Sequence, residues 1–479
     1  MRKRFEQQLR LGVTPIEQIK VGNGRDAQVA VLQALQWMFI TPEVNEEIFS
    51  LLESKLSPKQ KALGRTGMDM WTVLVFGVMR LTRKQSYDDL RYSANNDLLM
   101  REMVGIGRME NDPQFSLTSI KENLSLLSED LLMEINSIVM KHGGGLVQKK
   151  NEQIKLKTDS YVCETNVHFP TDLNLALDAA RKSIELSYNF ATRHMLPGWR
   201  KSNDWKRRVK SKYLRVARIK NGGGKNKGDR LIKSVKEYLE VLEELQDKVA
   251  LALLIFRSKA NDPSSLILVE EIRQFHDYLI KHIDLIIRRL IHGETIPHEE
   301  KVFSLFEPHT EWITKGKSRP NVELGHRLLI TTNQHGLIVD HQVMESITDS
   351  EAVPELIDRL SDKYAGKVIS SHSFDKGFYS ASNKQKVGEM ASVVVMPKKG
   401  KRNLKEQEEE RGKKFKKLRN EHSAVESDIN CLEHHGLDRC PDKGLANYKR
   451  YVALGVLTYN LHKIGNALLG VARGRKKVA

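Results

Sequence analysis

Three acidic residues have sequence contexts in which their carboxylates could take part in catalysis. Asp159 lies in KLKTDSYVCETN, Asp375 in FDKGFYS and Glu426 in NEHSAVESDIN. The two aspartates are 216 residues apart, and Glu426 follows Asp375 after 51 residues. Side chains so distant in sequence can act together only if a rigid frame brings them to one place. Three clustered carboxylates would then suit hard divalent metal ions, which prefer oxygen ligands.

The surrounding patterns indicate which elements would hold these carboxylates. The segment 154–169 alternates apolar and polar residues and predicts a strand that contains Asp159. The segment 367–380 predicts a strand that runs into a loop at Asp375, where Gly377 permits a tight turn. Glu426 falls within a predicted helix that ends at Gly436. Strand ends and an adjacent helix are the usual positions of functional carboxylates in such sheets.

Other carboxylates compete for the same role. The chain has 61 acidic residues, and an aspartate on a strand is more often a cap, a surface charge or a salt-bridge partner. Apolar neighbours at helical spacing predict that the face of Glu426 is partly inward and that Asp428 points elsewhere. The rivals are Asp178, Glu323, Asp340, Asp349, Glu421 and Asp428.

The wider pattern predicts a mixed α/β protein. Residues 1–145 read as a helical N-terminal domain that ends at the glycines 143–145. Strands are expected at 154–169, 302–306, 326–333, 337–344, 367–374 and 391–397, with a helix at 349–364 for which Asp349 is the expected N-cap. We therefore expect one α/β domain made of 146–171 and 301–470. An all-α insertion, 172–300, interrupts it, and a basic tail, 471–479, follows.

The positive charge is concentrated in two windows. The 479 residues include 78 Lys and Arg against 61 Asp and Glu, for a net charge of +17. Between residues 200 and 230, thirteen basic residues stand against two acidic ones, a net of +11, and between 398 and 419 eleven stand against four, a net of +7. Together these windows exceed the charge of the whole chain. They indicate a polyanionic partner, with a solvated helix face as the alternative for either window.

Nucleic acid is the polyanion that these windows suit best. Lys and Arg contacts to phosphates release counterions, and the first window interleaves Trp199, Trp205 and Tyr213, which could stack on bases. We expect phosphate contacts from the following residues: Lys206, Arg207, Arg208, Lys315, Lys317, Lys376, Lys398, Lys399, Lys401 and Arg402.

Several classes of protein and site are not expected. No apolar run approaches the ~18–20 residues of a membrane-spanning helix. The basic N-terminus lacks the apolar stretch of a secretory signal, and three cysteines without CxxC spacing favour a reducing compartment, so the cytoplasm is expected. No HExxH pattern and no GxxxxGK[ST] loop occur, so we expect neither a zinc site nor a nucleotide cofactor.

Four segments resemble the DDE transposases of bacterial insertion sequences, a group with a ribonuclease H-like catalytic fold. These are KTDSYVCETNVHFPTD, HTEWITKGKSRPNVELGHR, FDKGFYS and HSAVESDINCLEHHGLDRCPDKG, and the resemblance extends from about residue 30 to 470. It implies that Asp159, Asp375 and Glu426 are the catalytic and metal-binding triad. Related families often place Arg four residues before the Glu and Lys seven after it, whereas His422 and Glu433 stand here.

The resemblance also implies an activity. Two Mg²⁺ or Mn²⁺ ions about 3.5–4 Å apart would activate a water or a 3′-hydroxyl, with Asp159 bridging them and Asp375 and Glu426 each holding one. The expected function is cleavage at terminal inverted repeats and transfer of the 3′ ends to target DNA. The protein is expected to associate with the bacterial nucleoid and to form a homodimer or a larger assembly on DNA. The alternatives are a noncatalytic, sequence-specific DNA-binding relic and a DDE-type nuclease without strand joining.

Overall fold

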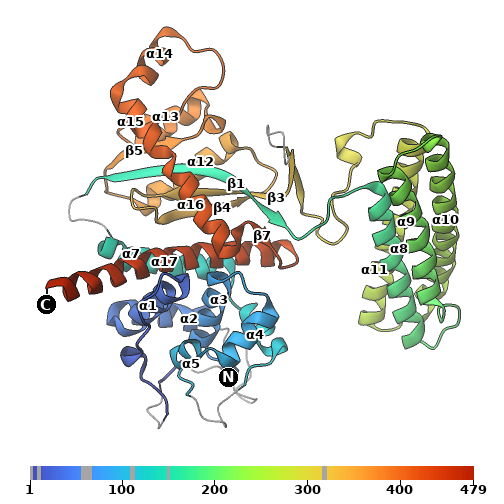
Figure 1. The fold of residues 1–479 in the computed structure, drawn as a ribbon, viewed down its shortest axis with the longest axis horizontal. Coiled ribbons are helices and arrows are strands. Elements are labelled where there is room, and N and C mark those ends of the chain that lie inside the picture. The colour runs from blue at the N-terminus through green and yellow to red at the C-terminus, as the bar shows by residue number, and fades with distance from the viewer. Residues whose placement is uncertain are drawn as a thin grey trace. The chain divides into compact units, whose positions relative to one another are not determined.

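The computed structural model describes residues 4–7, 12–55, 67–107, 114–147, 152–314 and 321–478. The chain divides into two compact units, one formed by Met1–Asn166 with Glu311–Ala479 and the other by Val167–Thr310 (Figure 1). The first unit contains helices and a mixed sheet, and the second is helical. The prediction of a mixed α/β protein is therefore confirmed.

A seven-stranded mixed sheet forms the centre of the first unit. The central strand β1 pairs antiparallel with β3 on one edge and parallel with β5 on the other, and β6 continues the sheet beyond β5. Strands β4 and β2 both pair antiparallel with β3, while β7 pairs with the end of β1. The strands are β1 (Ile154–Thr165), β2 (Glu311–Thr314), β3 (Val322–Thr332), β4 (Ile338–Met344), β5 (Ile369–Phe374), β6 (Val394–Val395) and β7 (Arg439–Cys440).

Helices cover both faces of this sheet, because successive strand residues point to opposite sides. Leu156 and Leu329 share a core with α12 (Asp349–Lys363) and α13 (Ala381–Met390). Tyr161 and Ile330 instead join a larger core with α16 (Ala424–Leu432), α17 (Leu445–Val478) and the N-terminal helices. Figure 1 shows α12 and α17 on opposite sides of the strands.

The N-terminal helices share their core with α17, so they belong to the same compact unit as the sheet. Ser86 and Ser116 are the N-caps of two of them, and their side chains accept hydrogen bonds from the first-turn backbone. These helices are α1 (Ala27–Ile40), α2 (Pro42–Lys55), α3 (Met70–Thr82), α4 (Tyr87–Asn96), α5 (Leu98–Met103), α6 (Leu117–Leu124) and α7 (Glu129–Val147). Two further helices, α14 (Leu404–Arg411) and α15 (Lys413–His422), precede α16.

The prediction that the glycines 143–145 end the N-terminal helical segment is wrong in detail. Helix α7 continues through them to Val147. A Cβ atom at Gly143 would lie only 2.5 Å from Ile464 Cδ1, so glycine at this position permits close packing of α7 against α17. The glycine therefore marks a helix contact, which a single sequence cannot distinguish from a helix stop.

The second unit is a bundle of four helices, α8 (Asp172–Arg193), α9 (Ser202–Asn221), α10 (Lys227–Lys259) and α11 (Pro263–Ile286). Asp262 is the N-cap of α11 and Pro263 is its first residue, a position that proline suits. The strand predicted at 302–306 is absent from the described structure, where this segment is coil. Leu305 is part of the bundle core instead, and Val302 packs against that core. The apolar residues of this segment therefore contact helices and do not pair with a strand.

The crossing of α17 with α1 provides a test of this packing. A Cβ atom at Gly465 would overlap the Ala30 carbonyl oxygen, a backbone atom that cannot rotate away. We expect Gly465→Ala to destabilise the protein by about 1–3 kcal/mol in chemical denaturation, since overpacking forces the backbone to shift.

The matched control lies one turn further along α17. Gly470 has open space where a Cβ would stand. We expect Gly470→Ala to be neutral or to stabilise by up to about 1 kcal/mol, through helix propensity. Equal effects of the two substitutions would contradict the close crossing of α1 and α17.

Candidate active site

The parallel pairing of β1 with β5 places two of the predicted carboxylates side by side. The ladder ends with Thr158 opposite Phe374, and Asp159 and Asp375 follow directly on the two strands. Neighbouring strands lie about 4.8 Å apart, so the two aspartates occupy adjacent positions at the carboxyl end of this strand pair. Asp159 is half-buried, and Asp375 is exposed in the turn that leads to the 3₁₀ segment Lys376–Phe378.

Helix α16 brings Glu426 to the same place. Val425, Asp428 and Leu432 form the buried stripe of this helix, so Glu426 in its first turn faces solvent. The prediction of a partly inward face for Glu426 is therefore wrong, because the helix buries the neighbouring positions at i−1 and i+2. Glu426 still lies close enough to Asp159 for its charge to affect that carboxyl.

Asp428 has a structural role instead. Its carboxylate accepts a hydrogen bond of 2.7 Å from the Tyr459 hydroxyl and lies 3.3 Å from the Lys463 ammonium. Gly336, with φ +70°, approaches it so closely that a Cβ atom there would lie 2.6 Å from the Asp428 Oδ1 atom. Asp428 thus anchors α16 to α17 and does not share the position of Glu426.

The ionised form of the Asp159 carboxylate is disfavoured in the folded protein. Burial, followed by the nearby charges of Asp375, Asp349 and Glu426, raises the pKa of Asp159 to about 7, although the backbone N–H of Ser160 donates to Asp159 Oδ1 at 2.8 Å and opposes this. Like charges disfavour one another's ionised forms unless a cation compensates them. The group therefore favours either a bound proton or a bound metal ion.

The three carboxylates do not meet as the ligands of one ion. Oxygens that share one Mg²⁺ lie about 2.1 Å from it and hence within roughly 4.2 Å of each other. Among the described residues, the one set of three His, Cys, Asp or Glu residues with ligand atoms all within 4.8 Å of one another does not include the triad.

Asp349 was expected to be the N-cap of the helix at 349–364 and was one of the carboxylates that compete with the triad. The expected N-cap role is wrong. Thr348 is the N-cap, and Asp349 is the first residue of α12. The Ser160 hydroxyl donates to Asp349 Oδ1 at 2.7 Å, and a Cβ atom at Gly377 would lie 2.8 Å from Asp349 Oδ2. Asp349 thus connects the residue after Asp159 to the turn after Asp375.

His422 is a second residue near the site without an assigned role in the sequence analysis. Its Nδ1 atom lies 3.0 Å from the Ser373 hydroxyl, two residues before Asp375. Burial lowers the pKa of His422 to about 4, so its ring is neutral at pH 7. This contact attaches the end of α15 to β5 and thereby positions α16, which begins two residues later.

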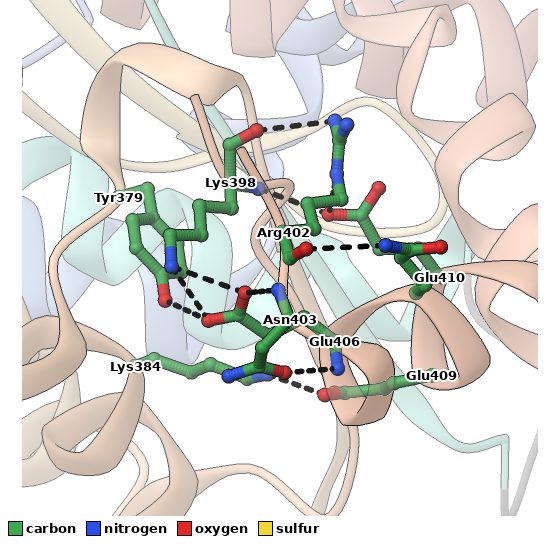
Figure 2. A network of polar contacts seen from close by, with 9 residues as sticks. Tyr379, Lys384, Lys398, Arg402, Asn403, Glu406, Glu409 and Glu410 are labelled. Atoms are coloured by element: carbon green, nitrogen blue, oxygen red, sulfur yellow. Dashed lines mark hydrogen bonds and ion pairs between the residues drawn. The ribbon is translucent and has the colours of Figure 1, made fainter. Parts of the chain in front are cut away.

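Two of the predicted phosphate-binding residues are engaged within the protein. The Lys398 ammonium lies 2.9 Å from Glu406 Oε1, and Arg402 Nε lies 2.8 Å from Glu410 Oε1. Figure 2 shows both pairs around the start of α14, together with the Lys384 to Glu409 pair. These carboxylates compensate the charges of Lys398 and Arg402, whereas Lys399, Lys401 and Lys376 are exposed.

Helix α15 presents more available positive charge. Phe415 is its buried residue, and its exposed cations form no ion pair within the described part of the chain. These cations are Lys413, Lys414, Lys416, Lys417 and Arg419. Because α15 leads directly into α16, this basic face lies on the same rigid segment as Glu426.

The aromatic residues of the other window do not lie as predicted. Trp199 is buried, and Trp205 and Tyr213 pack against the core of the helical bundle. Trp205 and Tyr213 lie on the face of α9 that packs against this core, so none of the three aromatic residues is an exposed stacking surface.

The cations of that window are partly neutralised. Arg208 pairs with Glu244 at 2.7 Å, Arg207 pairs with Asp204, and Lys206 is half-buried. The predicted contacts Lys315 and Lys317 fall outside the described residues.

Comparisons of the chain with protein-family models, curated proteins and solved structures gave no match. Within the described ranges, no helix is long and apolar enough to cross a membrane. Only the geometry of the residues therefore indicates a functional site at these carboxylates.

The raised pKa of Asp159 gives a pH-dependent prediction. An unfolded Asp titrates near pH 4, so between pH 4 and 7 the folded, metal-free protein binds more protons and loses stability as the pH rises. Asp159→Asn removes this cost. We expect it to raise the thermal unfolding midpoint in EDTA at pH 8 by roughly 2–4 °C, and by less at pH 5.

The control is an exposed carboxylate on α12, Asp362. Asp362→Asn should leave the midpoint unchanged at both pH values. If Asp159→Asn lowers the midpoint at pH 8, the carboxylate is stabilising in its ionised form, and the mutual repulsion described above is wrong.

Proposed function

We propose that this chain is a DDE transposase, an enzyme that cleaves DNA at the terminal inverted repeats of an insertion sequence and joins the 3′ ends to target DNA. The observation that carries the proposal is the convergence of Asp159, Asp375 and Glu426 from β1, β5 and α16. A sheet with β1 between an antiparallel hairpin and two parallel strands is also compatible with a ribonuclease H-like fold.

The carboxylates would hold two divalent metal ions. Mg²⁺ or Mn²⁺ bound there would lower the pKa of an attacking water or 3′-hydroxyl and stabilise the leaving 3′-oxygen. Asp159 would bridge the ions, while Asp375 and Glu426 would each complete one coordination shell. The exposure of Asp375 and Glu426 supports this assignment, because a duplex can reach the site without opening the fold.

DNA binding would come mainly from α15 and the adjacent turn. Five exposed cations on α15 continue into the helix that carries Glu426, and Lys376 directly follows Asp375. Their charges would attract phosphates toward the carboxylates. Synapsis of two element ends would require a homodimer or a larger assembly, and a cytoplasmic location belongs to the same proposal.

Cleavage of DNA that carries the inverted repeats flanking the coding sequence tests the catalytic assignment. With Mg²⁺ or Mn²⁺ at pH 8, the wild type should nick these ends. Asp159→Asn, Asp375→Asn and Glu426→Gln should each slow cleavage by at least about 10³-fold, equivalent to ~4 kcal/mol of lost transition-state stabilisation.

Glu421→Gln is the matched control, because Glu421 lies on α15 five residues before Glu426 and pairs with Lys155 at 3.3 Å. It should retain cleavage within about threefold. Full cleavage by Asp375→Asn would contradict the assignment. Repeat-specific binding without any cleavage by the wild type would instead favour the DNA-binding relic, and cleavage without joining would favour the nuclease.

The salt dependence of DNA binding tests the role of α15. Each phosphate contact contributes about 0.9 to the slope of log K against log salt. Replacing Lys413, Lys414, Lys416 and Lys417 together with Gln should weaken binding and reduce the slope by about 2–4. The measurement is the fluorescence anisotropy of a labelled DNA duplex over a salt range of roughly 50–300 mM.

Lys398→Gln provides the comparison, since Glu406 already compensates this lysine. We expect it to reduce the slope by less than about 0.5. An unchanged slope in the α15 variant would identify its cations as a solvated face without a role in DNA binding.

A further inference from the structure

A separate group of potential metal ligands lies where α16 meets α17. One ligand atom each from Cys431, His435 and His462 lies within 4.8 Å of the others. Cys431 is at the end of α16, His435 follows in a π-helical turn (Glu433–Leu437), and His462 projects from α17. These residues are distinct from the carboxylates of the candidate active site.

The local backbone explains how Cys431 and His435 come together. Cys431 lies in the last turn of α16, and His435 follows where the chain leaves the helix, with the non-helical angles φ −87° and ψ 19°. Gly436 then takes φ +91°, and a Cβ atom there would lie 2.5 Å from the Tyr451 hydroxyl oxygen. The turn is therefore held in one conformation, with the His435 ring buried against α17.

The hydrogen bonds of His435 define which nitrogen is available to a metal. Its Nδ1 atom lies 3.3 Å from the Leu81 carbonyl oxygen, which can only accept, so Nδ1 carries the hydrogen. Its Nε2 atom then presents a lone pair to His462 Nδ1 at a distance of 3.0 Å. A histidine that donates its other N–H to a backbone carbonyl is the usual form of a metal ligand.

The two histidines have the protonation state that a metal site needs, whereas metal binding would have to displace the proton of the Cys431 thiol, whose pKa is raised by burial. Burial lowers the pKa of His435 to about 4, and burial with the nearby Lys463 ammonium also lowers the pKa of His462. Both rings are thus neutral at pH 7, which is the form that binds metals. The Asp26 carboxylate near His462 is already bound by Arg83 at 2.7 Å, so it does not complete the group.

We propose that Cys431, His435 and His462 bind one Zn²⁺ ion, with a water in the fourth position. One thiolate and two imidazoles favour Zn²⁺ over Mg²⁺, and three protein ligands with an open position form a known zinc geometry. The ion would join α16, which carries Glu426, to α17. No zinc site was expected from the sequence, because it contains no HExxH pattern and no CxxC spacing. His462 follows His435 by 27 residues, a separation that neither pattern covers.

Zinc titration of the full-length protein against a chromophoric chelator tests this site. The wild type should bind one equivalent of Zn²⁺, and a large excess of Mg²⁺ should not displace it. Cys431→Ser and His462→Gln should each weaken Zn²⁺ binding by about 10–100-fold or more. His434→Gln, which changes an exposed neighbouring histidine, should leave it unchanged.

Cobalt provides a spectroscopic readout that the wild-type protein can give by itself. Co²⁺ bound to the wild type should show thiolate-to-metal charge-transfer absorption, and this band should disappear in Cys431→Ser. Asp159→Asn should leave both the zinc stoichiometry and the cobalt band intact, so this result is independent of the proposed transposase activity. Absence of stoichiometric Zn²⁺ binding and of the cobalt band in the wild type would overturn the proposal and leave a simple hydrogen bond between His435 and His462.

Discussion

The parallel pairing of β1 with β5 is the constraint on which the candidate active site depends. Its last pair is Thr158 opposite Phe374, and this pair fixes the positions of Asp159 and Asp375, which follow directly on the two strands. The Thr158 hydroxyl lies 2.7 Å from both Thr331 Oγ1 and His372 Nε2, so β3, β1 and β5 are also linked beneath the site. A shift of one residue in this pairing would move Asp375 to the opposite face of the sheet.

Helix α16 depends on the same frame through a different set of contacts. The His422 contact with Ser373 and the burial of Val425 attach its start to the sheet, while Asp428 binds Tyr459 and Lys463 on α17. The proposed zinc ligands would fix the other end of the same helix. Within the described part of the chain, the Glu426 carboxylate forms no hydrogen bond or ion pair, while its neighbours on α16 are packed in place. This is the arrangement expected of a functional side chain.

Local periodicity predicted most of the elements, because the helices and long strands each bury one face. It also located the strand of Asp159, the strand end at Asp375 and the helix of Glu426. It could not predict that Trp205 and Tyr213 point into a core or that Glu406 and Glu410 compensate Lys398 and Arg402, because these contacts depend on tertiary packing. The two-residue strand β6 and the position of Asp349 beside Ser160 depend on sheet assembly in the same way.

The central claim is that three carboxylates form one metal-binding site, and anomalous diffraction from crystals grown with Mn²⁺ at pH 8 tests it most directly. The account predicts two anomalous peaks about 3.5–4 Å apart, with Asp159 between them and Asp375 and Glu426 on separate ions. Ordered side chains of all three residues with no anomalous density among them would contradict it.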